Sequence, residues 1–374
     1  MKALRRLGIA LATLVVALGL GEVAARLFTD VTPPILVRDP VIGRRLQPGL
    51  EAAVWDAEIR RDVPLRINAL GFRGPDRPEA KPAGVKRLSL LGDSMVASMS
   101  LEEPELLTSL LEQRLEAARP VTDWDVINWG VPASSNAQEL VLYREHVRDF
   151  DSDVVVLGLF AGNDLADNSR RLTSYPRIYF DFDESGALVQ QPFSGGRAAA
   201  SRWLNRHSRF YVWQKTLARS KPILAISEDF RPELWIFARE TNEDVEHAWS
   251  IMRATLELFR DEVRADGAEL VVCMIPCAEQ IYTDAFEMML EAAAERGASM
   301  DPDEPERRVA AFCEELGVPF HSLVPALREA SAGRSLADES AWLFYGGRGH
   351  WNARGNAVGA ESLARFLVDG GFAD

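Results

Sequence analysis

The chain has 374 residues, of which 47% are hydrophobic and 26% charged, as in an ordinary globular protein with one large domain or two modest ones. Its net charge of −14 argues against nucleic acid as the main partner, because phosphate binding needs a basic surface. Cys273, Cys277 and Cys313 are too few for a disulfide framework, although a single disulfide is open if the domain is exported. We interpret Cys273 and Cys277 as small semi-buried residues rather than a metal or redox pair.

The first 28 residues have the pattern of an export signal. Basic residues, including Arg5 and Arg6, precede an apolar run over residues 7–21, and the apolar trend continues to residue 28 despite Glu22. By the positive-inside rule the basic flank stays inside, so the body of the chain is exported. We therefore expect a single-pass protein of the cell membrane with a periplasmic or extracellular domain, or else a secreted one.

Two interpretations of this segment are open. Val23 and Ala25 suit the −3 and −1 positions of a cleavage site, which would make residues 1–28 a signal peptide. Alternatively, the segment stays as a signal anchor, since its apolar trend approaches the ~20 residues of a spanning helix. We favour the anchor.

The rest of the chain divides into an extension and one α/β domain. Residues 29–85 are rich in Pro, Arg and Asp, and we interpret them as a linker and N-terminal extension containing the stretch NALGFRGPD. Over residues 86–374, apolar runs alternate with amphipathic stretches, as in βαβ units of a parallel sheet. An insertion rich in Trp, Arg and Ser interrupts this alternation at about 165–242. The pattern predicts strands at 87–91, 124–128, 153–160, 268–275 and 318–321, and helices at 103–118, 135–148, 243–265, 279–296, 305–316 and 353–368.

Four short segments carry candidate chemistry at the predicted carboxyl edge of the sheet. Ser94 follows the first strand in LLGDSMV and opens a helix, so it is a candidate nucleophile, or else a simple N-cap. Gly130 follows the second strand and is a candidate backbone donor, or a turn glycine. Asn163 follows the third strand and its amide suits an oxyanion hole, or an Asx turn. Of five histidines, His350 is the candidate base, because it lies in a Gly-rich loop before the last helix.

Ser94, Gly130, Asn163 and His350, in this order, resemble the sequence blocks of the SGNH (GDSL-like) hydrolase superfamily. Together with NALGFRGPD and the His-Trp-Asn run, they are similar to a membrane-anchored bacterial subgroup of esterases and acyltransferases. The resemblance implies a three-layer α/β sandwich with a five-stranded flavodoxin-like parallel sheet. It also implies that Ser94 attacks an ester carbonyl, that His350 is its base, and that Ser94, Gly130 and Asn163 hold the oxyanion.

One position departs from the family pattern. The family places an Asp two or three residues before the histidine, where this chain has Arg348 and Gly347. A backbone carbonyl could orient the imidazole, a carboxylate such as Asp338 or Glu339 could replace the Asp, or the site could be impaired. Arg348 could contact an anionic substrate group if it does not point toward the imidazole.

The sequence therefore predicts an O-acyl esterase that acts on a small-molecule, glycan or lipid ester. An O-acyltransferase of envelope polysaccharide, or a catalytically weak glycan-binding or assembly protein, is the alternative. We expect no cofactor and no metal, because Asp93 and Asp164 have no convergent set of further carboxylates around them.

Overall fold

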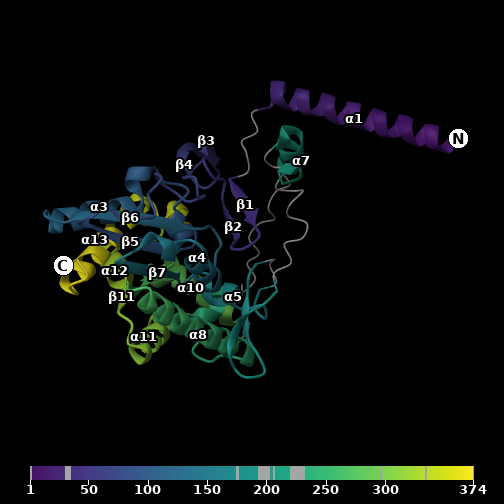
Figure 1. Ribbon diagram of the computed structural model, residues 1–374. Helices are drawn as coiled ribbons and strands as arrows, with labels where there is room; N and C mark the ends of the chain where they lie inside the picture. The colour runs from purple at the N-terminus through teal and green to yellow at the C-terminus, as the bar shows by residue number, and fades with distance from the viewer. Residues whose placement is uncertain are drawn as a thin grey trace.

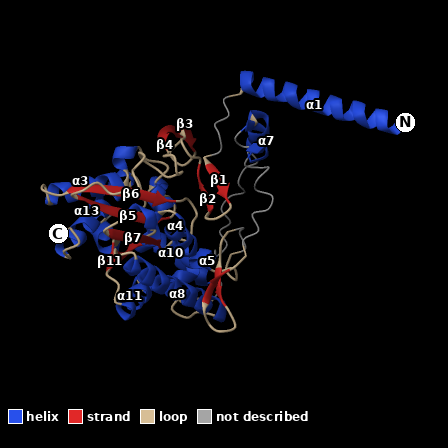
Figure 2. Cartoon of the chain, viewed as in Figure 1, coloured by secondary structure: helices blue, strands red, loops and turns tan. Residues whose placement is uncertain are grey.

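The apolar runs of the sequence form one five-stranded parallel sheet in the computed structural model (Figures 1 and 2). The strands lie in the order β11-β10-β7-β5-β6, which is the flavodoxin-like order in which the first strand lies between the second and the third. The structure describes residues 2–29, 35–173, 177–192, 203–204, 207–219, 232–294, 297–332 and 335–373. The strands are β5 (Val85–Gly92), β6 (Asp123–Gly130), β7 (Val154–Phe160), β10 (Glu269–Ile275) and β11 (Phe320–Ser322).

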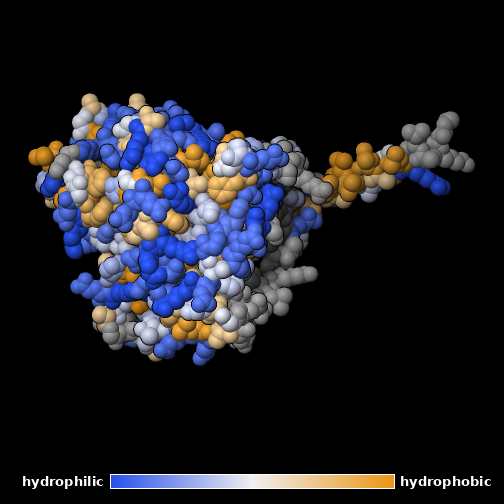
Figure 3. All heavy atoms as spheres, turned by 90° about the horizontal axis from the view of Figure 1, so that it is seen from below, coloured by the Kyte–Doolittle hydropathy of each residue, from blue (hydrophilic) through white to orange (hydrophobic). Residues whose placement is uncertain are grey.

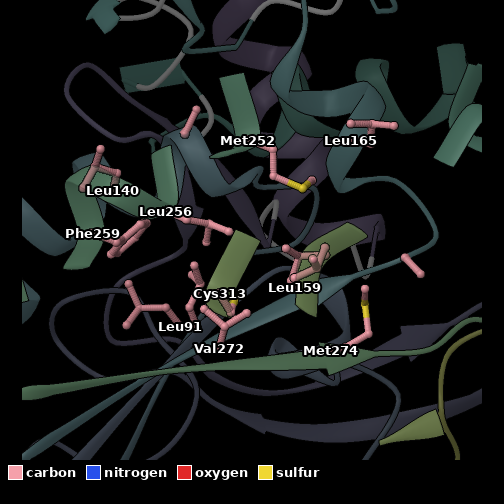
Figure 4. Close-up of a cluster of buried hydrophobic side chains, with 14 of the residues drawn as sticks. Leu91, Leu140, Leu159, Leu165, Met252, Leu256, Phe259, Val272, Met274 and Cys313 are labelled. Atoms are coloured by element: carbon pink, nitrogen blue, oxygen red, sulfur yellow. The ribbon is translucent and has the colours of Figure 1, made fainter. Parts of the chain in front are cut away.

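Helices cover both faces of this sheet, because successive strand residues point to opposite sides and both sets are apolar. Leu91, Leu157 and Val272 point into one core, which is shown in Figure 4, whereas Leu90, Val156 and Val271 point into the other. The first core is covered by α4 (Asn136–Glu145), α8 (Glu243–Ala265) and α11 (Glu304–Leu316), and the second by α3 (Leu107–Ala118), α12 (Val324–Ala330) and α13 (Ala353–Asp369). The predicted three-layer α/β sandwich is confirmed.

The predicted elements match the observed ones closely within this domain. All five strands are present, and the helix predicted at 243–265 has those bounds as α8. The helix predicted at 279–296 is instead divided, because the chain turns at Tyr282 between α9 (Ala278–Ile281) and α10 (Thr283–Ala294). The short helices α2 (Ser94–Ala97) and α5 (Asp164–Asn168) follow β5 and β7 directly.

The N-terminal extension forms two antiparallel hairpins. The first pairs β1 (Leu36–Asp39) with β2 (Gly43–Leu46), and the second pairs β3 (Glu51–Asp56) with β4 (Arg61–Arg66). Val54, Val63 and Leu65 of the second hairpin form a small separate core with Leu46 and Ile67. Arg73 also donates to the carbonyls of Ser98 and Leu101 at 3.0 and 2.9 Å, so the extension is folded against the domain and is not only a linker.

Two further groups of elements lie outside the sandwich. The N-terminal helix α1 (Lys2–Phe28) extends away from it and lies beside α7 (Arg209–Arg219) in Figure 1. The region predicted as an insertion also contains the hairpin of β8 (Phe180–Phe182) and β9 (Leu188–Gln190), which packs near α8.

Candidate active site

Ser94 is placed at the carboxyl edge of the sheet by the turn between β5 and α2. It is the first residue of α2, and Asp93 caps this helix by accepting a hydrogen bond from the Met95 N–H at 2.8 Å. The helix lasts a single turn, because Ser98 adopts a left-handed conformation with φ 44°. The half-buried hydroxyl of Ser94 is thus held at the end of a buried strand.

His350 reaches Ser94 from the loop that leads into α13. Its Nε2 lies 3.0 Å from Ser94 Oγ, although the two residues are 256 positions apart. The loop is held by the Tyr345 N–H, which donates to the His350 carbonyl at 2.8 Å, and by Asn352, which caps α13. The sequence prediction that these two side chains meet is matched by this geometry.

The carboxylate that orients His350 comes from the N-terminal extension. Glu58, in the turn between β3 and β4, places its Oε2 2.9 Å from His350 Nδ1. Its Oε1 accepts the backbone N–H of His350 at 2.8 Å, so both oxygens hold the same residue. With the proton on Nδ1 donated to Glu58, Nε2 is left to accept the proton of Ser94, as a general base requires.

The approach of Glu58 depends on a glycine. A Cβ at Gly349 would lie 1.8 Å from Glu58 Oε1 and 2.8 Å from the Tyr345 carbonyl oxygen. On the other side, Ser100 Oγ donates to Asp56 Oδ2 at 2.8 Å and lies 3.3 Å from Glu58 Oε2. The hairpin turn is therefore fixed between the nucleophile region and the histidine loop.

The pKa values of the pair are shifted in the directions that favour its charged form. Burial alone would raise the pKa of Glu58, but the hydrogen bonds and charge of His350 lower it below its usual value. The pKa of His350 is raised chiefly by the hydrogen bond with Glu58, against the opposing effect of desolvation. An imidazolium formed during catalysis is thus stabilised where it arises.

Gly130 is the last residue of β6 and pairs with Gly92, at the edge of the sheet that the sequence suggested. Its N–H donates to Asn128 Oδ1 at 2.9 Å, and a Cβ there would lie 2.3 Å from the Ala97 nitrogen. Gly130 is therefore needed for α2 to pack closely on β6, and its N–H is already engaged. Gly130 stays a predicted oxyanion donor, with its N–H bonded to Asn128 in this structure.

Asn163 lies at the same edge as Ser94, because β7 and β5 are adjacent parallel strands. Its Nδ2 donates to Asp167 Oδ2 at 2.9 Å, and Asp167 pairs with Arg177 at 2.5 Å. An amide nitrogen carries two protons, so one remains for a ligand. With the Ser94 N–H at the start of α2, Asn163 remains a candidate oxyanion donor.

The three residues considered as orienting or substrate-contact groups lie elsewhere. Asp338 accepts from the Ser340 N–H at 3.1 Å and caps a short 3₁₀ helix, and Glu339 is exposed in that helix. Arg348 donates to Glu279 Oε1 at 2.7 Å. Of the alternatives that the sequence left open, a carboxylate does bond to His350, but it is that of Glu58 rather than Asp338 or Glu339. Arg348 pairs with Glu279 instead of pointing toward the imidazole.

Sequence reasoning missed Glu58 because it looked for a carboxylate near His350 in the chain. The two are 292 positions apart. In the sequence, Glu58 is a glutamate in a turn-forming stretch of the extension. Such a residue cannot be told apart from an ordinary solvent-exposed charge.

A buried set of carboxyl groups lies beneath the site. Burial raises the pKa of Asp93 to about 6 and that of Glu139 to about 8, and raises the pKa of Asp164 as well. Ser134 Oγ and Asn136 Nδ2 donate to Glu139 at 2.8 and 3.1 Å. Within the described ranges, no group of three or more His, Cys, Asp or Glu residues could hold a metal ion.

Comparisons with known proteins give matches among solved structures only. No family model matches the chain, and no curated protein matches it. The chain is similar to a variant of Axe2, an acetyl xylan esterase from Geobacillus stearothermophilus, with 14% identity, TM-score 0.42 and coverage of 77% of this chain and 96% of that one. It is also similar to LAE5, an α/β hydrolase from the metagenome of Lake Arreo, with 13% identity, TM-score 0.42 and coverage of 77% and 96%. A third is a putative lipolytic protein of the G-D-S-L family from Desulfitobacterium hafniense, with 10% identity, TM-score 0.38 and coverage of 75% and 99%.

Proposed function

We propose that this chain is a serine ester hydrolase of the SGNH kind, exported and acting on O-acyl esters. The observation that carries the proposal is the hydrogen-bonded series Ser94–His350–Glu58, with contacts of 3.0 and 2.9 Å. A nucleophile, a base within reach and a carboxylate that orients the base are the groups that acyl transfer requires.

The reaction follows from these contacts. Ser94 Oγ attacks the ester carbonyl while His350 Nε2 takes its proton, and Glu58 stabilises the resulting imidazolium. Asn163 Nδ2 and the Ser94 N–H stabilise the tetrahedral oxyanion. His350 then protonates the leaving alcohol, and water, activated by the same imidazole, hydrolyses the acyl-enzyme and restores Ser94.

The two alternative functions, a glycan-binding protein and an O-acyltransferase, involve the same site. A catalytically weak glycan-binding protein was suggested by Arg348 and Gly347 at the usual Asp position, and Glu58 supplies the carboxylate whose absence motivated that reading. Acyl transfer to a sugar uses the same acyl-enzyme, so it differs only in which hydroxyl attacks in the second half-reaction. The half-exposed imidazole leaves the site open to acceptors larger than water.

The test uses Ser94→Ala in the full-length protein. Wild-type protein is expected to hydrolyse a 4-nitrophenyl acetate substrate and to react covalently with a fluorophosphonate at Ser94, whereas the variant does neither. Ser340→Ala, which removes an exposed hydroxyl in the segment before His350, is the matched control and retains both. A wild-type protein that never reacts, or a Ser94→Ala variant that still does, overturns the proposal. Adding acetyl acceptors such as xylo-oligosaccharides then separates transfer from hydrolysis.

A further inference from the structure

Helix α1 presents an apolar surface along its length. Residues Arg5–Phe28 form a 24-residue segment that is long enough to cross a membrane, and an 18-residue window within it has a mean hydropathy of 2.1. Leu7, Leu11 and Leu20 are each more than 60% exposed, and Figure 3 shows α1 as an apolar rod that projects from the polar body. Such a surface is stable in lipid and unfavourable in water.

Glu22, near the end of this apolar helix, binds the start of α7. Its carboxylate accepts hydrogen bonds from Ser208 Oγ at 2.7 Å and from the N–H groups of Arg209 and Phe210 at 3.0 and 3.1 Å. Arg26, one turn further along α1, pairs with Glu22 at 2.8 Å. Four donors thus satisfy a carboxylate that would otherwise be costly beside a membrane-spanning stretch.

The two helices also fit sterically at this point. A Cβ added at Gly21 would lie 3.1 Å from the Phe210 ring, so the absence of a side chain allows the aromatic ring to pack against α1. Arg26 Nη2 donates to the His207 carbonyl at 3.1 Å, which joins α1 to the segment just before α7. The contact therefore combines hydrogen bonds, charge and packing.

The sequence of α7, RFYVWQKTLAR, has the composition of a helix at a lipid–water boundary. Aromatic residues are enriched at that depth, and cationic residues on the same helix attract lipid phosphates. Phe210 and Trp213 stack with ring centroids 5.9 Å apart. Glu22 lies in the penultimate turn of α1, so a bilayer-spanning α1 would place Glu22 and the start of α7 at the level of the headgroups.

We propose that α1 is retained in the mature protein and that α7 lies in the lipid headgroup layer beside it, docked through Glu22. This goes beyond the proposed esterase function and does not depend on it. Cleavage after Ala25 would remove Glu22 and leave the first N–H groups of α7 without their acceptor. The docking of α7 on α1 therefore requires that α1 is retained.

Fluorescence quenching tests the position of α7. The three native cysteines are buried, so Gln214→Cys on α7 can be labelled selectively in the full-length protein. Val121→Cys, at a site 96% exposed on the α/β domain, is the matched control. In vesicles of phosphatidylcholine and phosphatidylglycerol with a headgroup spin label, the Gln214→Cys label is expected to be quenched and the Val121→Cys label not.

Glu22→Ala in the Gln214→Cys background should reduce quenching to the level of the Val121→Cys control. An unchanged thermal unfolding curve of the α/β domain separates loss of docking from misfolding, whether or not the protein proves to be an esterase. Mass spectrometry of membrane-isolated protein should recover the tryptic peptide spanning residues 7–26. A mature N-terminus at residue 26, equal quenching of the two labels, or quenching that Glu22→Ala leaves unchanged would each overturn the proposal.

Discussion

Replacing Glu58 with Gln removes the charge that His350 needs while keeping the shape of the side chain. The carboxylate oxygens lie 2.9 Å from His350 Nδ1 and 2.8 Å from its backbone nitrogen. A hydrogen bond to a charged group contributes about 1.5–3 kcal/mol. Because the His350 side chain is 44% exposed, water reduces this contribution toward the lower end of that range.

At about 1.4 kcal/mol per factor of ten, this loss lowers kcat at least ~10-fold when the imidazolium forms in the transition state. The amide of Gln can also donate to Nδ1 and select the wrong tautomer, an effect that costs ~10⁴ in a serine protease. We therefore expect Glu58→Gln to lower kcat by between ~10-fold and ~10⁴-fold, with little change in KM.

The pH dependence has a defined sign. His350 must be neutral to act as a base, so activity rises with pH through its pKa, which the hydrogen bond with Glu58 raises above its usual value. In Glu58→Gln that support is lost, and the acid limb of kcat/KM moves to lower pH. The assay measures kcat/KM for hydrolysis of 4-nitrophenyl acetate as a function of pH, for the wild type and for Glu58→Gln. Circular dichroism checks that the variant is folded.

Glu339→Gln is the matched control, because Glu339 is an exposed glutamate in the segment before His350. It should leave both the rate and the pH profile unchanged. A Glu58→Gln enzyme that keeps its rate to within about threefold, with an unmoved acid limb, would refute the reasoning that Glu58 orients the base.

Two further predictions concern the surroundings of the site. Gly349→Ala should lower kcat as Glu58→Gln does, because the new Cβ meets Glu58 Oε1 at 1.8 Å. The same Cβ lies 2.8 Å from the Tyr345 carbonyl oxygen, so Tm should fall as well, and full activity in 4-nitrophenyl acetate hydrolysis would contradict the geometry. Glu139→Gln should flatten the dependence of Tm on pH. Burial and Asp93 raise the pKa of Glu139 from 4.5 to about 8, so its stabilising contribution is complete below pH 4.5 and is lost as pH rises through about 8. A variant whose Tm falls over this interval as steeply as that of the wild type would show that Glu139 is not the group responsible.

The sequence by itself determined the sandwich and two members of the site. Apolar runs at strand length and amphipathic helices are local patterns, so the five strands and α8 were predictable from short windows of residues. Ser94 and His350 were predictable for a related reason, since each lies where a strand or loop meets a helix at the sheet edge.

Only the tertiary structure decided how those residues are supported. A carboxylate orients an imidazole through its position in space, and Glu58 reaches that position because its hairpin is anchored to the segment after α2, where Arg66 Nε donates to Glu103 at 2.9 Å. No pattern near His350 encodes that contact. In the same way, the sequence suggested that Gly130 offers its N–H to a ligand. In the structure this N–H donates to Asn128 Oδ1, and the missing Cβ leaves room for Ala97. Local sequence sets secondary structure, whereas the partners of a polar group depend on which distant segments pack against it.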